Sequence, residues 1–159
     1  MGVEALYEGL KKIQDRGEIG NAYSGCGSVD SEMDVLTDFY DYYIVEKYED
    51  SMPSWAEAFV QIFNWQFETL HEYSQPYYEN DYADSDYKTI LRVAGYLREN
   101  GYHEIEKPYA AAAVDCGHRY PDEMIPLLPD NWIDENDETI WNFYVDILEK
   151  HREELLGDI

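Results

Sequence analysis

The sequence has few basic residues for its size. It contains 11 Lys and Arg against 35 Asp and Glu, so the formal net charge is −24. Affinity for a phosphate backbone comes from Lys and Arg that displace counterions, and a strongly acidic chain also repels anionic membranes. We therefore expect no direct binding to nucleic acid and none to a membrane.

Cysteine and histidine are too sparse to form a recognisable metal site. The two cysteines, Cys26 and Cys116, are far apart, and none of the four histidines belongs to an H-E-x-x-H arrangement. The acidic segment 81–87, DYADSDY, lacks the glycine and the distal glutamate of an EF-hand loop. The sequence predicts no metal site and no cofactor.

Signatures of catalysis are also missing. Cys116 lies two residues before His118, and an imidazole can activate a thiol, but nothing else marks this pair, so its role stays open. No glycine-rich phosphate loop is present, and carboxylates are so abundant that a catalytic pair would not stand out. We expect a protein that is not an enzyme and has no catalytic residues.

Long apolar runs are absent as well. No stretch reaches the roughly eighteen apolar residues of a membrane span, and the start of the chain lacks the apolar region of a secretory signal. The expected location is the cytoplasm, where the two thiols would be reduced.

The residues that are present favour helices. The length of 159 residues suits one domain, and 45% hydrophobic residues can form a core. Apolar residues recur at spacings of three and four, and no alternating pattern of a strand is visible. Gly101 is expected to end the helix that precedes it. The residues expected to face inward are Val3, Leu6, Leu10, Ile13, Met33, Leu36, Tyr40, Tyr43, Ile44, Trp55, Phe59, Ile62, Phe63, Phe67, Leu70, Ile90, Leu91, Ala94, Leu97, Ile140, Tyr144, Ile147, Leu148 and Leu155. We predict an all-α, single-domain bundle, residues 1–159, of about six helices around one core. The expected helices cover 3–15, 30–50, 53–73, 86–100, 103–118 and 137–156, and the expected loops cover 17–28, 73–87 and 119–135.

Acidic residues concentrate in the first half of the chain. Residues 17–87 hold sixteen acids and a single base, Lys47, and eight of these acids fall within 30–50. A helix of 21 residues is about 30 Å long, which gives one carboxylate per roughly 4 Å. One strand of DNA presents a phosphate per roughly 3.4 Å, so the two charge densities are comparable.

Four of these acids are expected to share one helix face. At about 100° per residue, Asp30, Asp34, Asp38 and Asp41 fall within an arc of about 80°. Carboxylates four residues apart repel each other, and a helix that needed only solubility could include lysines. We therefore predict a partner-binding surface, although the acids could also serve solvation alone. Its expected residues are Asp30, Asp34, Asp38, Asp41 and Glu49, with a second patch of Asp81, Asp84 and Asp86.

Tyrosines accompany the second patch. Five of them occur between residues 73 and 87, which is difficult to reconcile with burial in one loop, so we interpret them as part of a contact surface. A carboxylate beside a tyrosine suits a basic partner, because arginine can pair with the acid and stack on the ring. The five residues are Tyr73, Tyr77, Tyr78, Tyr82 and Tyr87.

Three stretches carry a family resemblance. They are FNWQFETLHEYSQPYYEN (63–80), ILRVAGYLRENGYHEIEKPYAAAA (90–113) and WIDENDETIWNFYVDILEKHREELL (132–156). Their order resembles the DNA mimic protein 19 family of small acidic bacterial proteins and covers about the last hundred residues. Family members often have a glycine pair before the aromatic stretch, where this chain has IFNWQFE. The resemblance implies an all-α fold and occupation of a transcription factor's DNA site, and it transfers no catalytic residue.

The predicted function is binding to a basic DNA-binding protein, with the acidic surface taking the place of nucleic acid. One alternative is an immunity protein that neutralises a cationic nuclease toxin, which would use the same electrostatics. Another is a small helical domain with a ligand pocket, which would show a concavity lined by converging polar groups. The sequence does not indicate an oligomeric state.

Overall fold

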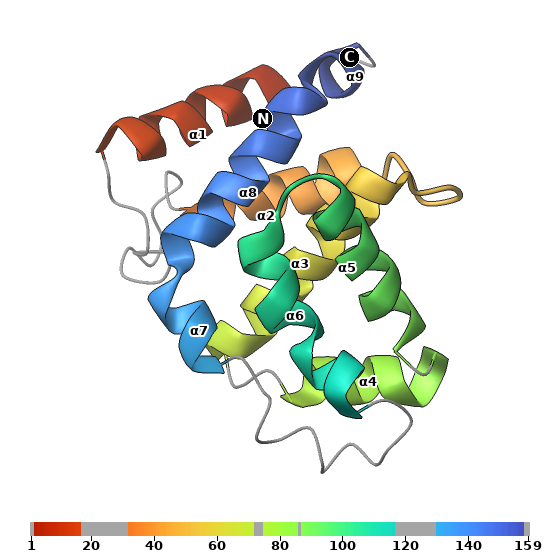
Figure 1. The fold of residues 1–159 in the computed structure, drawn as a ribbon. Coiled ribbons are helices and arrows are strands. Elements are labelled where there is room, and N and C mark those ends of the chain that lie inside the picture. Colours follow the sequence, from red (N-terminus) through yellow and green to blue (C-terminus); the bar gives the residue numbers. More distant parts are fainter. Residues whose placement is uncertain (1, 17–31, 72–74, 86, 117–129, 158–159) are drawn as a thin grey trace. The chain divides into compact units, whose positions relative to one another are not determined.

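The computed structural model describes residues 2–16, 32–71, 75–85, 87–116 and 130–157 (Figure 1). These ranges contain helices, turns and bends and no strand, which confirms the all-α class. They hold nine α-helices and one π-helix, more than the six helices expected. The chain divides into two compact units, which we call the terminal unit (Met1–Pro53 and Ile140–Ile159) and the central unit (Ser54–Thr139). That the whole chain is a single domain stays a prediction.

The terminal unit combines the two ends of the chain. Helix α1 (Val3–Arg16) forms as predicted, and the Tyr7 hydroxyl donates a hydrogen bond of 2.6 Å to the Leu148 carbonyl in α8 (Asp137–Lys150). The expected helix 137–156 is interrupted at His151, after which α9 (Arg152–Leu156) begins. The predicted inward residues of both ends are buried: Val3, Leu6, Leu10, Ile13, Ile140, Tyr144, Ile147, Leu148 and Leu155.

The single regular helix predicted for 30–50 is wrong. Helix α2 (Glu32–Asp38) gives way to a π-helix, η1 (Phe39–Val45), and the chain then turns and bends. Phe39 and Ile44 are both 0% exposed, although they would lie about 140° apart on an α-helix. The i→i+5 pattern of a π-helix brings residues five apart to nearly the same side, so both side chains can be buried.

This change of helix type alters both faces of the segment. The predicted inward residues Tyr40 and Tyr43 are only half-buried, and Phe39 takes their place in the core. The 80° arc of acids assumed 100° per residue and does not apply beyond Asp38.

The central unit is built around α3 (Ser54–His71), as predicted. Helices α5 (Lys88–Glu99) and α6 (His103–Cys116) pack against each other across a tight turn. In that turn Gly101 has φ of +85°, and the Tyr102 amide donates to the Leu97 carbonyl at 2.8 Å. This is the glycine helix end that the sequence predicted. Two predicted core residues are partly exposed instead: Phe67 (39%) and Leu91 (45%).

Two expected loops contain helices. Residues 73–87 include α4 (Gln75–Ser85), with Pro76 at its second position, where a missing amide hydrogen costs little. Tyr77, Tyr78 and Tyr87 are buried, so their interpretation as a contact surface is wrong. Tyr73 and the side chain of Tyr82 lie outside the described part of the structure. Residues 119–135 include α7 (Asp130–Glu135), and the rest of that range is likewise not described. Among the described helices, none combines the length and apolar character that crossing a bilayer requires.

Candidate acidic interaction surface

The first predicted patch falls in the terminal unit. Asp41 in η1 and Glu49 in the bend after it are exposed, whereas Asp38 at the end of α2 is half-buried. Asp34 belongs to α2, but its side chain lies outside the described part of the structure, as does the whole of Asp30. Two of the five expected residues are therefore seen to face solvent.

The second predicted patch falls in the central unit, where Asp81 has a structural contact. Its Oδ2 accepts a hydrogen bond of 3.1 Å from the Ile90 amide in the first turn of α5. Tyr87, at the N-cap position of α5, makes no capping bond with its own side chain, so Asp81 satisfies an amide that the helix start leaves open. The Asp84 side chain and all of Asp86 lie outside the described residues.

Exposed residues that the sequence reasoning did not select extend the first patch. Glu46 and Asp50 are exposed, and Tyr42 is 63% exposed directly beside Asp41. We refer to Asp41, Tyr42, Glu46, Glu49 and Asp50 as the acid–tyrosine surface. Within the described ranges, none of its four carboxylates forms an ion pair with a lysine, an arginine or a histidine.

Helix α9 holds the backbone that carries this surface. Lys47, the one base among residues 17–87, donates from Nζ to the Glu154 carbonyl at 2.6 Å. The Tyr48 hydroxyl donates to Glu154 Oε1 at 2.6 Å, and His151 Nδ1 lies 3.5 Å from Glu154 Oε2. Because residues 47 and 48 are both anchored to α9, the acids on either side of them have a defined position.

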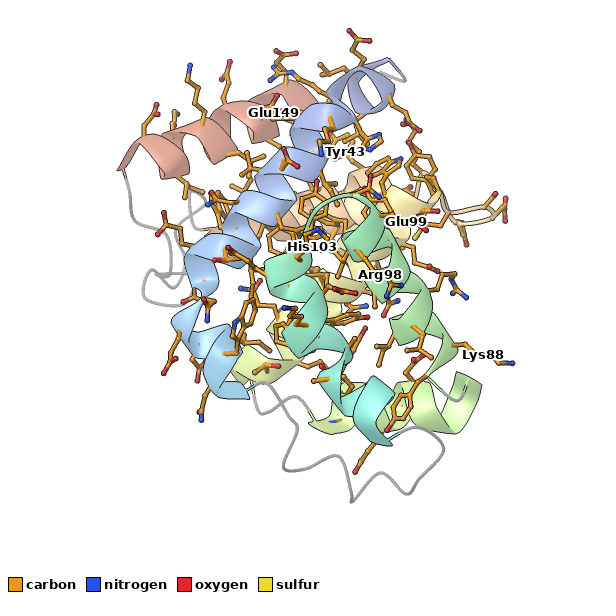
Figure 2. All side chains as sticks on the ribbon, viewed as in Figure 1. Tyr43, Lys88, Arg98, Glu99, His103 and Glu149 are labelled. Atoms are coloured by element: carbon orange, nitrogen blue, oxygen red, sulfur yellow. The ribbon has the colours of Figure 1, made fainter. Side chains whose placement is uncertain are left out.

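Arg152, another cation of the terminal unit, pairs with different acids. The Arg152 guanidinium contacts Glu4 at 3.2 Å and Glu149 at 3.5 Å, and it lies 4.5 Å from the centre of the Tyr7 ring. Glu149 lies on α8 (Figure 2). These pairs tie the end of the chain to α1 rather than neutralising η1.

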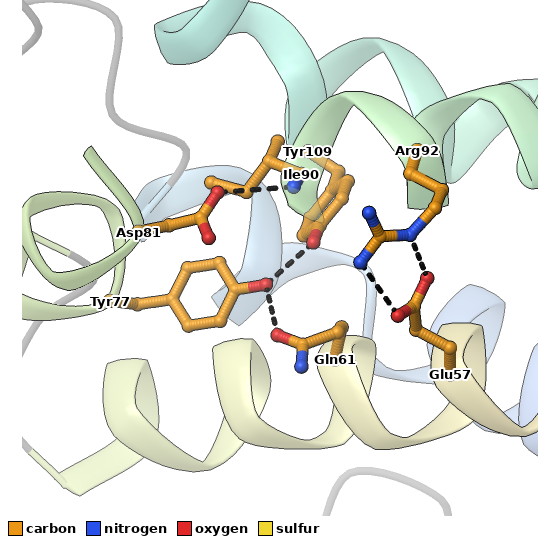
Figure 3. Close-up of polar contacts among 7 residues, drawn as sticks. All are labelled: Glu57, Gln61, Tyr77, Asp81, Ile90, Arg92 and Tyr109. Atoms are coloured by element: carbon orange, nitrogen blue, oxygen red, sulfur yellow. Dashed lines mark hydrogen bonds and ion pairs between the residues drawn. The ribbon is translucent and has the colours of Figure 1, made fainter. Parts of the chain in front are cut away.

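The central unit uses two of its arginines in the same way. Arg92 makes a bidentate pair with Glu57, at 2.6 and 2.9 Å (Figure 3), and Arg98 lies 3.3 Å from Glu106. The Glu57 carboxylate raises the pKa of the Arg92 guanidinium above its ordinary value, so the pair stays charged. Lys88, by contrast, points away from the start of α5 (Figure 2).

Buried tyrosines connect three helices of the central unit. The Tyr77 hydroxyl in α4 donates to Gln61 Oε1 in α3 at 2.9 Å and lies 2.5 Å from the Tyr109 hydroxyl in α6 (Figure 3). The Tyr78 hydroxyl donates to the Tyr109 carbonyl at 2.8 Å. These bonds satisfy hydroxyl groups that would otherwise be buried without partners, which explains why α4 turns its tyrosines inward.

These tyrosines predict a loss of stability in alkali. Burial raises the pKa of Tyr77 and Tyr109 well above the ordinary value near 10. The folded state therefore holds their protons when the unfolded state has lost them, so their stabilising contribution is complete below pH 10 and is lost as the pH rises further.

Above pH 10 the free energy of unfolding should fall less steeply in Tyr77→Phe than in the wild type, by about 1.4 kcal/mol per pH unit. Phenylalanine has no hydroxyl proton that the folded state keeps and the unfolded state loses. Urea unfolding of both proteins between pH 7 and 11.5 measures the slope. Equal slopes for the two proteins would contradict a buried, protonated Tyr77.

Sequence reasoning could have included Glu46 and Asp50, since both belong to the run of eight acids. The α-helical wheel excluded them, and that wheel does not apply to a π-helix or to the turn and bend that follow it. The helical wheel placed Tyr42 beside the acids, whereas no local signal indicated that Gln61 meets Tyr77. In the described ranges no three His, Cys, Asp or Glu side chains are arranged to hold a metal ion, and the Cys116 side chain and His118 lie outside that part.

Comparison of the chain with protein-family models, curated proteins and solved structures gave no match. The resemblance to the DNA mimic protein 19 family stays a prediction.

Proposed function

We propose that this protein binds a basic protein through the acid–tyrosine surface and occupies the site where that partner holds nucleic acid. The observation that supports this is the exposure of Asp41, Glu46, Glu49 and Asp50 without an ion-pair partner among the described residues. Unpaired carboxylates on an anchored backbone can accept hydrogen bonds from arginine and lysine at the positions where phosphates would otherwise do so.

Tyr42 adds a second kind of contact. Its ring is 63% exposed, and burying it against a partner removes apolar surface from water. An arginine of the partner can also stack on the exposed ring, beside other arginines that pair with the carboxylates. A cationic nucleic-acid site supplies arginines of this kind.

The whole chain supports the encounter. A net charge of −24 attracts a cationic partner over distances beyond contact, and exposed charges are screened at about 8–10 Å under physiological salt. Affinity for the partner should therefore fall steeply as the salt concentration rises. The seven-residue π-helix is consistent with a functional segment. Turns of π-helix are rare in proteins, and those that occur are often found at functional sites.

We expect the quadruple variant Asp41→Asn, Glu46→Gln, Glu49→Gln and Asp50→Asn to lose about 10- to 100-fold in affinity, because interfacial charge pairs couple strongly. The matched control neutralises four exposed acids of the central unit, which lowers the net negative charge by the same amount, and it should bind at least about tenfold more tightly than the quadruple variant. Its positions are Glu99, Glu104, Glu135 and Glu138.

The partner is first captured at low salt from a lysate of the producing cells and then purified. Duplex DNA is added to the purified complex, and the proposal requires that DNA and this protein exclude each other in a gel-shift assay. If the captured protein is a nuclease whose activity is inhibited, the immunity alternative is correct. Equal affinity of the quadruple variant and its control for the partner would refute the acid–tyrosine surface as the binding site.

A further inference from the structure

A polar pocket of about 330 Å³ lies between α3 and α4 in the central unit. None of the described residues that line it is aliphatic: three carry carboxamides, two carry carboxylates and one is a tyrosine. They are Gln61, Asn64, Glu68, Tyr77, Asn80 and Asp81. Helix α3 contributes Gln61, Asn64 and Glu68, and helix α4 contributes Tyr77, Asn80 and Asp81. Each helix therefore forms one wall of the pocket.

The pocket carries negative charge. No lysine or arginine is among the described residues that line it, and Arg92 is held by Glu57. Glu68 is half-buried and makes no hydrogen bond or ion pair with another described residue. Burial is the largest cause of the raised pKa of Tyr77, and the charges of Asp81 and Glu68 raise it further. This is consistent with a negative potential at the pocket floor.

The tyrosine network fixes the floor of the pocket. The Tyr77 hydroxyl has one proton and donates it to Gln61 Oε1. It therefore accepts the hydrogen bond from the hydroxyl of Tyr109, which is fully buried. The carboxamide of Gln61 is thereby oriented, with its oxygen already engaged. The carboxylates of Glu68 and Asp81 accept hydrogen bonds and cannot donate them when ionised. These two carboxylates favour a ligand that supplies donors and positive charge.

We propose that this pocket binds a guanidinium group. A guanidinium offers five donors in a planar fork that matches carboxylate oxygens, and it is less strongly hydrated than an ammonium, so entering a partly enclosed site costs it less. The group belongs either to a free small compound or to an arginine side chain of a protein. This site lies in the central unit and does not depend on the acid–tyrosine surface.

The test is a titration of the purified protein with N-acetyl-arginine amide, followed by NMR. Two further probes change only the head group: N-acetyl-citrulline amide has nearly the same shape without charge, and N-acetyl-lysine amide carries an ammonium. We expect a dissociation constant on the order of 1 mM for the arginine compound. The other two compounds should bind at least about tenfold more weakly.

Glu68→Gln should weaken binding of the arginine compound by about tenfold, since the negative charge and one of the two acceptor oxygens are lost. The variant should fold normally because no described contact is removed, and circular dichroism checks this. Glu99→Gln, at an exposed position on α5 in the same unit, is the control and should bind as the wild type does.

Three results would each overturn the proposal. The citrulline compound could bind as tightly as the arginine compound, the lysine compound could do so, or Glu68→Gln could bind the arginine compound as the wild type does. The source of the group follows from the partner capture described above. If Glu68→Gln also loses the captured basic protein, the guanidinium is an arginine of that partner. If capture is unchanged while the titration succeeds, the ligand is a free compound.

Discussion

Replacing Trp65 by alanine is expected to lower the free energy of unfolding by about 3–5 kcal/mol, the range for large aromatic residues in a core. Trp65 is 0% exposed. Its ring lies edge-on to Tyr109 of α6, with centroids 5.1 Å apart, and stacks on Trp132 of α7 at 6.2 Å. The substitution removes the side chain through which α3 contacts both helices. Urea unfolding followed by circular dichroism measures the loss.

Trp65→Phe separates aromatic packing from side-chain volume. Phenylalanine keeps a ring between α6 and α7, and it removes the Trp65 Nε1 donor, which is buried without a hydrogen-bond partner among the described residues. A buried donor of this kind costs about 1–3 kcal/mol, so its removal offsets part of the lost packing. We expect a loss well under half that of the alanine variant. Equal losses would show that Trp65 does not act through these ring contacts.

Phe39→Ala is expected to cost a similar amount, about 3–5 kcal/mol, in the terminal unit. Phe39 is the first residue of η1 and is 0% exposed, and its ring lies edge-on to Tyr7 of α1 with centroids 5.1 Å apart. Burial of Phe39 together with Ile44 is our explanation for the π-helix. The substitution should therefore weaken η1 itself, which thermal unfolding and hydrogen exchange of residues 39–45 can measure.

Tyr42→Ala is the matched control, because it removes an aromatic ring from the same π-helix at a position that is 63% exposed. We expect its effect on stability to stay within about 0.5 kcal/mol, as for ordinary surface substitutions. A loss as large as that of Phe39→Ala would mean that η1 is stabilised by its outer face, contrary to our explanation.

The two alanine variants also test whether the chain is a single domain. If the terminal and central units unfold as one cooperative structure, Trp65→Ala and Phe39→Ala will each lower the midpoint of the same transition. If the units unfold independently, each variant will lower the transition of its own unit and leave the other in place.

Local sequence signals predicted much of the fold because they act within one helix. The spacing of Val3, Leu6 and Leu10 requires no information from elsewhere in the chain to predict α1. Gly101 likewise ends α5 through its own backbone conformation, with φ of +85°. The all-α class and the large negative charge were determined in this way.

Tertiary contacts determined the features that the sequence reasoning missed. The π-helix depends on burying Phe39 and Ile44 together, and the first of these packs against α1. Helix α4 depends on Tyr77 and Tyr78 finding hydroxyl partners on α3 and α6. Neither partner is close in sequence, so local periodicity contains no trace of either feature.

The sequence by itself determined how much negative charge this protein carries and that its backbone is helical, because both follow from residue types and their spacing. Only the tertiary structure decided what individual acids do. Asp41 faces solvent in η1, Asp81 accepts a hydrogen bond from the first turn of α5, and Glu57 holds Arg92. The physical reason is that exposure, capping and ion pairing depend on which helices meet, and those meetings join residues far apart in the chain.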